Sequence, residues 1–137
     1  MAQAVPGLVV RGGGMARFGE LEAAIMDVIW AAEAPVRVRE VSDQLNRDRP
    51  LAFNTVQTVM ENLYRKGWVA RYKDGRAYRY ESARSRDDYA AGLLAEALSA
   101  AGDPAATLMR LVGELEPGEI ARLRAALDAA VDREPPP

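Results

Sequence analysis

Hydrophobic positions recur at helical spacing in the segment NTVQTVMENLYRKG, residues 54–67. They fall at i, i+3, i+4 and i+7, which is the pattern of one face of an amphipathic helix. These apolar positions are Val56, Val59, Met60 and Leu63. The pattern therefore predicts a helix with one side buried in a core and the other side polar.

The polar side of this helix carries short side chains that donate or accept hydrogen bonds. Such side chains read base edges when a helix enters the major groove of DNA. We therefore expect five residues to contact bases: Asn54, Thr55, Gln57, Thr58 and Glu61. The alternative is that Asn54, followed three residues later by Gln57, caps the start of the helix and contacts no ligand.

A short hairpin is predicted directly after this helix, in VARYKDGRAYRY, residues 69–80. Two strand-like runs flank Asp74-Gly75, which is a strong signal for a two-residue turn of type I′. The apolar residues at the base of the hairpin, Val69 and Tyr80, are expected to pack inward.

Cations are concentrated in this helix and hairpin, although the whole chain has a formal net charge of −2. Six basic residues between Leu63 and Tyr80 accompany a single acidic residue, Asp74. We expect the basic side chains to contact DNA phosphates, with Lys73 opposite Arg76 across the turn. They are Arg65, Lys66, Arg71, Lys73, Arg76 and Arg79. A polar-faced helix followed by a basic hairpin is the layout of a winged helix-turn-helix.

Two further helices are predicted before this segment. The first begins near Phe18, keeps one apolar face and is ended by Pro35. The second covers residues 38–45 and presents Val38, Val41 and Leu45 to the core. Two arginines at its start, Arg37 and Arg39, either approach a phosphate or are solvated, and we expect solvation.

The chain changes character after Ser82. Residues 1–82 carry twelve basic and ten acidic side chains, whereas residues 83–137 carry six basic and ten acidic ones. Three helices are predicted there, over about 85–101, from Asp103-Pro104 and from Glu116-Pro117. So short a segment buries too little surface to fold alone, which predicts a homodimer formed through its apolar faces. The expected dimerisation residues are Leu93, Leu94, Ala97, Leu98, Leu108, Leu111, Val112, Ile120, Leu123 and Leu127.

The predicted fold is mainly α, a winged helix-turn-helix with a C-terminal α-helical dimerisation region. We expect disordered tails at 1–16 and 133–137, a winged-helix DNA-binding domain at 17–82 and a helical dimerisation domain at 83–132. The tail includes three consecutive glycines, but Arg17 stands where a G-x-G-x-x-G phosphate loop needs its last glycine. Met15 is an alternative start, in which case residues 1–14 would not belong to the native protein.

The composition excludes most of the usual catalytic and metal-binding sites. Cysteine and histidine are both absent, so thiolate and imidazole metal ligands, a catalytic thiol and a histidine base are excluded. We therefore expect no enzymatic activity, no metal and no cofactor. No apolar run approaches about 18 residues, and no signal peptide is recognisable, which predicts a cytoplasmic protein without membrane insertion.

Two functions are compatible with this pattern. The first is sequence-specific binding to double-stranded DNA, and the second is a winged-helix protein–protein interaction module without sequence-specific DNA binding. The concentrated cations favour DNA, because a phosphate backbone attracts such a surface.

Three segments resemble the penicillinase-repressor (BlaI/MecI/CopY) family of bacterial transcriptional regulators. They are FGELEAAIMDVIW at 18–30, LAFNTVQTVMENLYRKGWV at 51–69 and GRAYRYE at 75–81, and the similarity extends from about Arg17 to Val131. The resemblance implies a homodimeric repressor with interlocking C-terminal helices that binds a dyad operator.

The resemblance also implies a mode of induction. Family members are relieved by a membrane sensor-protease that cleaves the C-terminal region, or, in the copper branch, by metal binding to C-terminal cysteines. The family's cleaved Asn-Phe bond corresponds to Arg110-Leu111 here, and the copper branch is excluded because the chain has no cysteine. Asn62 is a second departure, because family members often have arginine at that position of the recognition helix.

Overall fold

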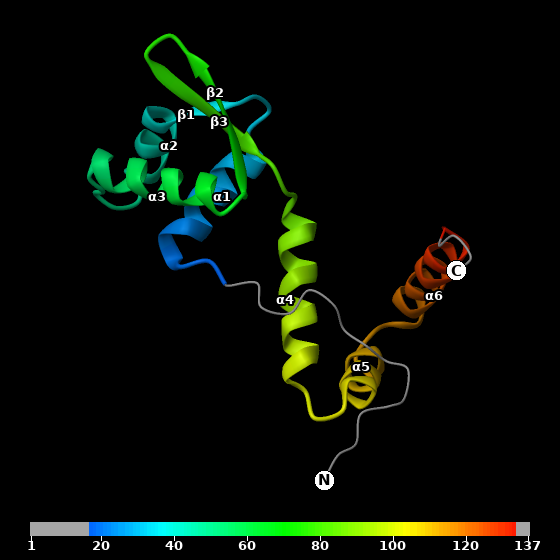
Figure 1. Cartoon of the computed structure of the whole chain (residues 1–137). Helices are drawn as coiled ribbons and strands as arrows, with labels where there is room; N and C mark the ends of the chain where they lie inside the picture. The colour runs from blue at the N-terminus through cyan, green and yellow to red at the C-terminus, as the bar shows by residue number, and fades with distance from the viewer. Residues whose placement is uncertain (1–16, 134–137) are drawn as a thin grey trace. The chain divides into compact units, whose positions relative to one another are not determined.

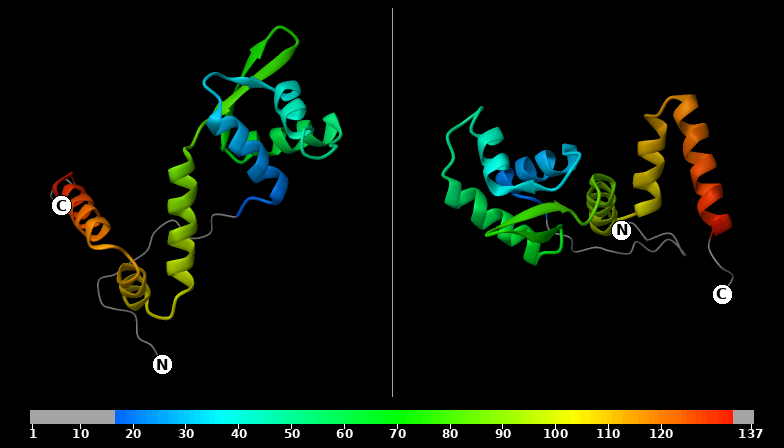
Figure 2. Two further views of the ribbon diagram at one scale, coloured as in Figure 1. Left: turned by 180° about the vertical axis from the view of Figure 1, so that it is seen from behind. Right: turned by 90° about the horizontal axis from the view of Figure 1, so that it is seen from above.

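The computed structural model describes residues 17–133 (Figures 1 and 2). The expectations about the N-terminal tail, its glycines and the alternative start, and those about residues 134–137, lie outside the described residues. The described chain forms two compact units that divide between Leu94 and Ala95. Each unit is described by itself.

The first unit is a winged helix-turn-helix, as the sequence predicts. Three helices pack beside a three-stranded antiparallel sheet with the strand order β1-β3-β2 (Figure 1). The helices are α1 (Glu20–Ala31), α2 (Val38–Leu45) and α3 (Phe53–Arg65), and the strands are β1 (Val36–Arg37), β2 (Val69–Asp74) and β3 (Ala77–Ser82).

One hydrophobic core holds this unit together, and it confirms the predicted helix faces. Val56, Met60 and Leu63 of α3 are fully buried, whereas Val59 is half-buried beside them. Val69 and Tyr80 at the base of the hairpin are buried as expected. The other buried apolar residues are Ile25, Met26, Ile29, Val36, Val41 and Trp68.

The turn between α2 and α3 is fixed by one amide side chain. Asn46 Nδ2 donates a hydrogen bond to the carbonyl oxygen of Ser42 at 2.7 Å. Asn46 Oδ1 accepts the backbone N–H of Leu51, also at 2.7 Å. The side chain therefore joins the end of α2 to the residues that lead into α3, and this fixes where α3 begins.

The start of α3 corrects the capping alternative for Asn54. The N-cap residue is Ala52, whose carbonyl accepts the backbone N–H groups of Thr55 and Val56 at 3.1 and 3.3 Å. Asn54 lies inside the first turn, and no side chain caps the helix. Its amide therefore remains exposed on the helix surface.

The hairpin turn lies one residue later than the sequence suggests. Asp74 pairs with Ala77, so the two loop residues are Gly75 and Arg76. Gly75 has a φ of 68°, and no non-glycine residue among those described has a positive φ. A loop that needs positive φ only at its first residue is of the II′ kind, so the type I′ prediction is wrong.

The corrected register also changes the tip of the hairpin. Lys73 pairs with Tyr78 rather than lying opposite Arg76, which stands in the loop. Strand β1 was not predicted at all. It has only two residues, which pair with Tyr80 and Arg79 of β3, and so short a strand leaves no alternation in the sequence.

An aromatic cluster joins α1 to the beginning of α4 (Arg86–Ala100), whose residues up to Leu94 belong to the first unit. The rings of Phe18 and Tyr89 stack at 4.1 Å between centroids, and Trp68 meets Phe18 edge-on at 4.9 Å. The backbone N–H of Phe18 donates to the Tyr89 hydroxyl at 2.8 Å. The compact unit thus extends beyond the predicted boundary at residue 82.

The second unit contains the rest of α4 together with α5 (Pro104–Gly113) and α6 (Pro117–Arg133). Asp103 caps α5 by accepting the Ala106 N–H at 3.2 Å, with Pro104 at the first helical position, as the sequence predicts. Large apolar side chains remain exposed on α5 and α6, among them Leu111, Leu123 and Leu127. None of the described helices is long and apolar enough to cross a membrane.

Candidate nucleic-acid interface

The side of α3 that faces away from the core carries the predicted base-reading residues. Asn54, Thr55, Gln57 and Thr58 are exposed. Glu61 is half-buried, and its carboxylate lies 3.8 Å from the guanidinium of Arg65 one turn later. Four of the five candidates are therefore open to a ligand, whereas Glu61 already has a cationic partner within the helix.

Asn62 is half-buried on the same helix. Its Oδ1 accepts a hydrogen bond from Arg65 Nη1 at 3.4 Å. Together with Glu61, it orients the Arg65 side chain along the end of α3.

Arg71 links the end of α3 to the wing, the β2–β3 hairpin. Its guanidinium lies 4.1 Å from the ring centre of Tyr64 on α3 and 4.3 Å from that of Tyr78 on β3. A guanidinium placed between two aromatic faces is attracted to both rings. Arg71 therefore links the wing to α3 through the Tyr64 and Tyr78 rings.

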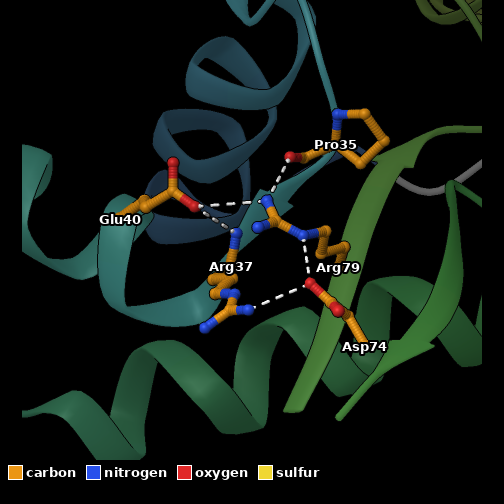
Figure 3. A network of polar contacts seen from close by, with 5 residues as sticks. All are labelled: Pro35, Arg37, Glu40, Asp74 and Arg79. Carbon is orange, nitrogen blue, oxygen red and sulfur yellow. Dashed lines mark hydrogen bonds and ion pairs between the residues drawn. The ribbon is translucent and has the colours of Figure 1, made fainter.

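A polar network ties the other side of the wing to the start of α2 (Figure 3). Asp74 Oδ2 accepts hydrogen bonds from Arg79 Nε at 2.6 Å and from Arg37 Nη2 at 2.9 Å. Arg79 Nη1 donates to the Pro35 carbonyl at 3.3 Å and lies 3.8 Å from a Glu40 carboxylate oxygen. That same oxygen accepts the Arg37 backbone N–H at 3.1 Å. The expectation that Arg37 is merely solvated is therefore wrong.

Ionisation within this interface follows from the same contacts. The hydrogen bond from Arg79, followed by that from Arg37, lowers the pKa of the Asp74 carboxyl below its ordinary value. The hydrogen bond to Glu81 raises the pKa of the Tyr72 hydroxyl on the outer face of the wing. Asp74 is thus a carboxylate at neutral pH, and it offsets positive charge at the hairpin turn.

The six predicted phosphate-binding cations fall into different structural situations. Lys66 forms an ion pair with Glu22 of α1 at 2.7 Å, and Arg79 belongs to the Asp74 network. Arg65 and Arg71 are held by neighbours on α3 and the wing. Lys73 and Arg76 form no ion pair with any residue between 17 and 133.

A cleft of about 350 Å³ lies between the start of α2, the wing-facing side of α3 and the tip of β3. Its polar and aromatic lining includes Arg37, Arg39, Phe53, Gln57, Arg76 and Tyr78. Sequence patterns do not predict this cleft, because its walls come from three segments that are separated along the chain. Among residues 17–133 no cluster of acidic side chains is arranged to hold a metal ion.

Comparison with known proteins places this architecture in a family. The penicillinase repressor profile matches residues 18–129. The transcriptional regulator BlaI of Mycobacterium tuberculosis, in strains CDC 1551 / Oshkosh and ATCC 25618 / H37Rv, is 37% identical over 128 residues. That alignment covers 89% of this chain and 93% of the relative.

The chain belongs to the penicillinase repressor family. The profile spans α3, the wing and most of the C-terminal helices of this family member. Two solved structures are also similar at 26% identity, each covering 56% of this chain and 93% of the other. One is the DNA-binding domain of the repressor BlaI (TM-score 0.49), and the other is monomeric BlaI of Bacillus licheniformis in complex with the blaP half-operator (TM-score 0.47).

Proposed function

We propose that this chain is a sequence-specific DNA-binding transcriptional repressor. The observation that carries the proposal is the exposed polar face of α3 beside a cationic wing, in a chain of the penicillinase repressor family. Asn54, Gln57 and Thr58 supply the donors and acceptors that distinguish base pairs in the major groove. Thr55 lies at the rim of that face, and Glu61 contributes only where DNA displaces Arg65.

The wing supplies phosphate contacts in this proposal. Lys73 and Arg76 are the foremost candidates, because neither forms an ion pair with an acidic residue within residues 17–133. Arg65 and Arg71 contact phosphate through the N–H groups that their neighbours leave open. Lys66 and Arg79 act mainly as internal supports, since each already holds a carboxylate at short distance.

The repressor acts as a homodimer on a dyad operator. Leu111, Leu123 and Leu127 are large apolar side chains that α5 and α6 leave exposed, and gathered apolar exposure of this kind is typical of an association surface. A second copy of the chain would bury that surface and place two reading helices on one operator. The other predicted dimerisation residues, Leu93, Leu94, Ala97, Leu98, Leu108, Val112 and Ile120, are half-buried or exposed, so they can join the same interface.

Relief of repression by a membrane sensor-protease would act on α5. Arg110 and Leu111 are both exposed, but their peptide bond lies within the helix Pro104–Gly113. A protease binds an extended chain, so cleavage requires α5 to open locally first. Thr107→Pro should therefore speed cleavage, because it removes the backbone hydrogen bond from Thr107 N–H to the Asp103 carbonyl and disrupts the helix without changing either residue of the cleaved bond.

Selection of bound duplexes from a random-sequence pool tests the main proposal. We expect the selected duplexes to share a dyad whose half-sites lie about 10 base pairs, or a multiple of that, apart. Footprinting should then show protection of both half-sites by the full chain. A chain that enriches no sequence, and whose duplex binding does not weaken with salt, would instead be the protein–protein interaction module.

A further inference from the structure

The cleft between α2, α3 and the wing contains cations that the reading face does not use. We propose that it seats one sugar–phosphate strand of the bound DNA, with Arg37 and Arg39 of the α2 start as contacts in addition to the wing cations. This inference rests on the proposed function and extends the interface to a third element of the fold.

The charges of the lining favour a polyanion. Arg37, Arg39 and Arg76 line the cleft together with one acidic residue, Glu61. The Glu61 carboxylate lies 3.8 Å from Arg65, which is not part of the lining. Arg37 is likewise paired with Asp74, which is not part of the lining either. Arg39 and Arg76 therefore carry the positive charge of the cleft that no carboxylate among residues 17–133 offsets, and a phosphodiester strand is attracted to such charge.

The walls of the cleft favour a strand rather than a base. Gln57 on one wall belongs to α3, the proposed major-groove reader, and Arg76 on another wall belongs to the wing. Where a helix occupies one groove and a hairpin lies along the neighbouring backbone, a DNA strand has to pass between the two elements. The cleft lies between these two elements, α3 and the wing.

Each of the two α2 arginines can donate to phosphate in its observed position. The Arg39 guanidinium lies over the Phe53 ring, 5.2 Å from its centre, and Arg39 forms no ion pair among residues 17–133, so no carboxylate there occupies its N–H donors. Arg37 uses Nη2 to bind Asp74 and retains further donors in a fixed orientation. Arg37 lines the cleft while its Nη2 is bound to Asp74 (Figure 3).

The test measures how binding of a random-sequence 20-base-pair duplex depends on salt, expressed per protomer bound. Each lost phosphate contact should lower the log–log slope by about 0.9. We expect Arg39→Ala and Arg37→Ala each to show this loss, and the double variant to lose about 1.8. Arg39→Lys keeps the charge and should keep the slope of the unmodified chain.

Two further variants separate contact from support. Arg49→Ala is the matched control, because Arg49 is an exposed arginine of the same unit that pairs with Glu20 and does not line the cleft. Its slope should equal that of the unmodified chain. Asp74→Asn disrupts the network but keeps Arg37, so its slope should not fall. A fall as large as that of Arg37→Ala would show that Arg37 acts only by supporting the wing, and would overturn its assignment.

The outcomes also distinguish this inference from the proposed function. An unmodified chain without salt-dependent duplex binding would contradict the function itself. Normal binding whose slope does not change in the Arg37→Ala, Arg39→Ala double variant would overturn the cleft and leave the function standing. Pyrophosphate provides a further check. If it raised the melting temperature of the unmodified chain but not that of the double variant, and the double variant kept its slope, the cleft would bind a small anion and not a DNA strand.

Discussion

The two units use apolar residues in opposite ways. The first unit buries eleven apolar side chains in one core, with α1, α3 and the sheet each contributing. In the second unit the structure buries only Pro104 among residues 95–133, and α6 has no buried residue. The first unit therefore derives its stability from within one chain, whereas the second has an apolar surface suited to association.

The largest expected effect tests the core of the first unit. Met60→Ala removes a fully buried side chain and should lower the free energy of unfolding by about 2–5 kcal/mol. Leu127→Ala is the matched change in the second unit, where the side chain is 59% exposed. It should leave urea unfolding of the first unit unchanged and weaken self-association instead. If both variants lowered the free energy of unfolding of the first unit equally, the two units would not differ in their use of apolar residues.

Removing the second unit should separate folding from assembly. A chain that ends at Leu94 retains Tyr89 and its stacking on Phe18, so we expect a folded monomer. Its operator affinity should fall about a hundredfold or more, because two linked readers bind their half-sites as one molecule. Sedimentation and footprinting measure both properties.

Truncation after Ser82 is the sharper companion experiment. It removes Tyr89 and opens the aromatic cluster, so this shorter chain should be less stable than the chain that ends at Leu94. If the two truncated chains unfolded at the same urea concentration, the start of α4 would not belong to the first unit.

Within the first unit, the reading face should differ from the phosphate-binding surface. Thr58→Ala removes an exposed side chain of α3 and should cost about 1–3 kcal/mol on the selected operator while leaving random-duplex binding nearly unchanged. Lys73→Ala should weaken both kinds of duplex alike, since a phosphate contact carries no sequence information. Titration of both variants against the operator and a random duplex measures this difference in affinity. If Thr58→Ala weakened binding to both duplexes equally, α3 would not be the element that recognises the sequence.

The smallest expected effect is a pH dependence of the Asp74 network. Because its two arginines lower the Asp74 pKa in the folded state, the network contributes stability above the unfolded pKa of about 4. That contribution is lost as the pH falls through the lower, folded pKa. The difference in urea midpoint between the unmodified chain and Asp74→Asn should therefore be present at pH 7 and shrink toward pH 3.

Asp43→Asn serves as the control for that measurement. Asp43 is exposed on α2 and forms no ion pair within residues 17–133. A pH response of Asp43→Asn equal to that of Asp74→Asn would assign the effect to general surface charge.

Local patterns predicted the elements of this protein well. The i, i+3, i+4, i+7 spacing identified the buried face of α3, and Asp103-Pro104 marked the start of α5 correctly. What local patterns could not predict depends on pairing between distant residues. The register of Asp74 with Ala77 moved the turn by one residue, and β1 exists only through its pairing with β3.

The candidate site was predictable in its residue types but not in its charge balance. The sequence identified six cations near the wing, yet it could not show that Glu22 holds Lys66 or that Asp74 holds Arg79. Both pairs join residues brought together by the fold. Sequence patterns likewise do not predict that Arg37 and Arg39 line a cleft, because the cleft forms only when α2, α3 and the wing meet.

The aromatic cluster has an optical consequence. The chain has two tryptophans, Trp30 and Trp68, and both lie in that cluster. The guanidinium of Arg86 lies 4.9 Å from the Trp30 ring centre and that of Arg84 lies 4.4 Å from Trp68. All indole emission of the protein therefore originates where α1 meets the beginning of α4. A red shift would report separation of these two helices without any added fluorophore, whereas unfolding confined to α6 would leave the spectrum unchanged.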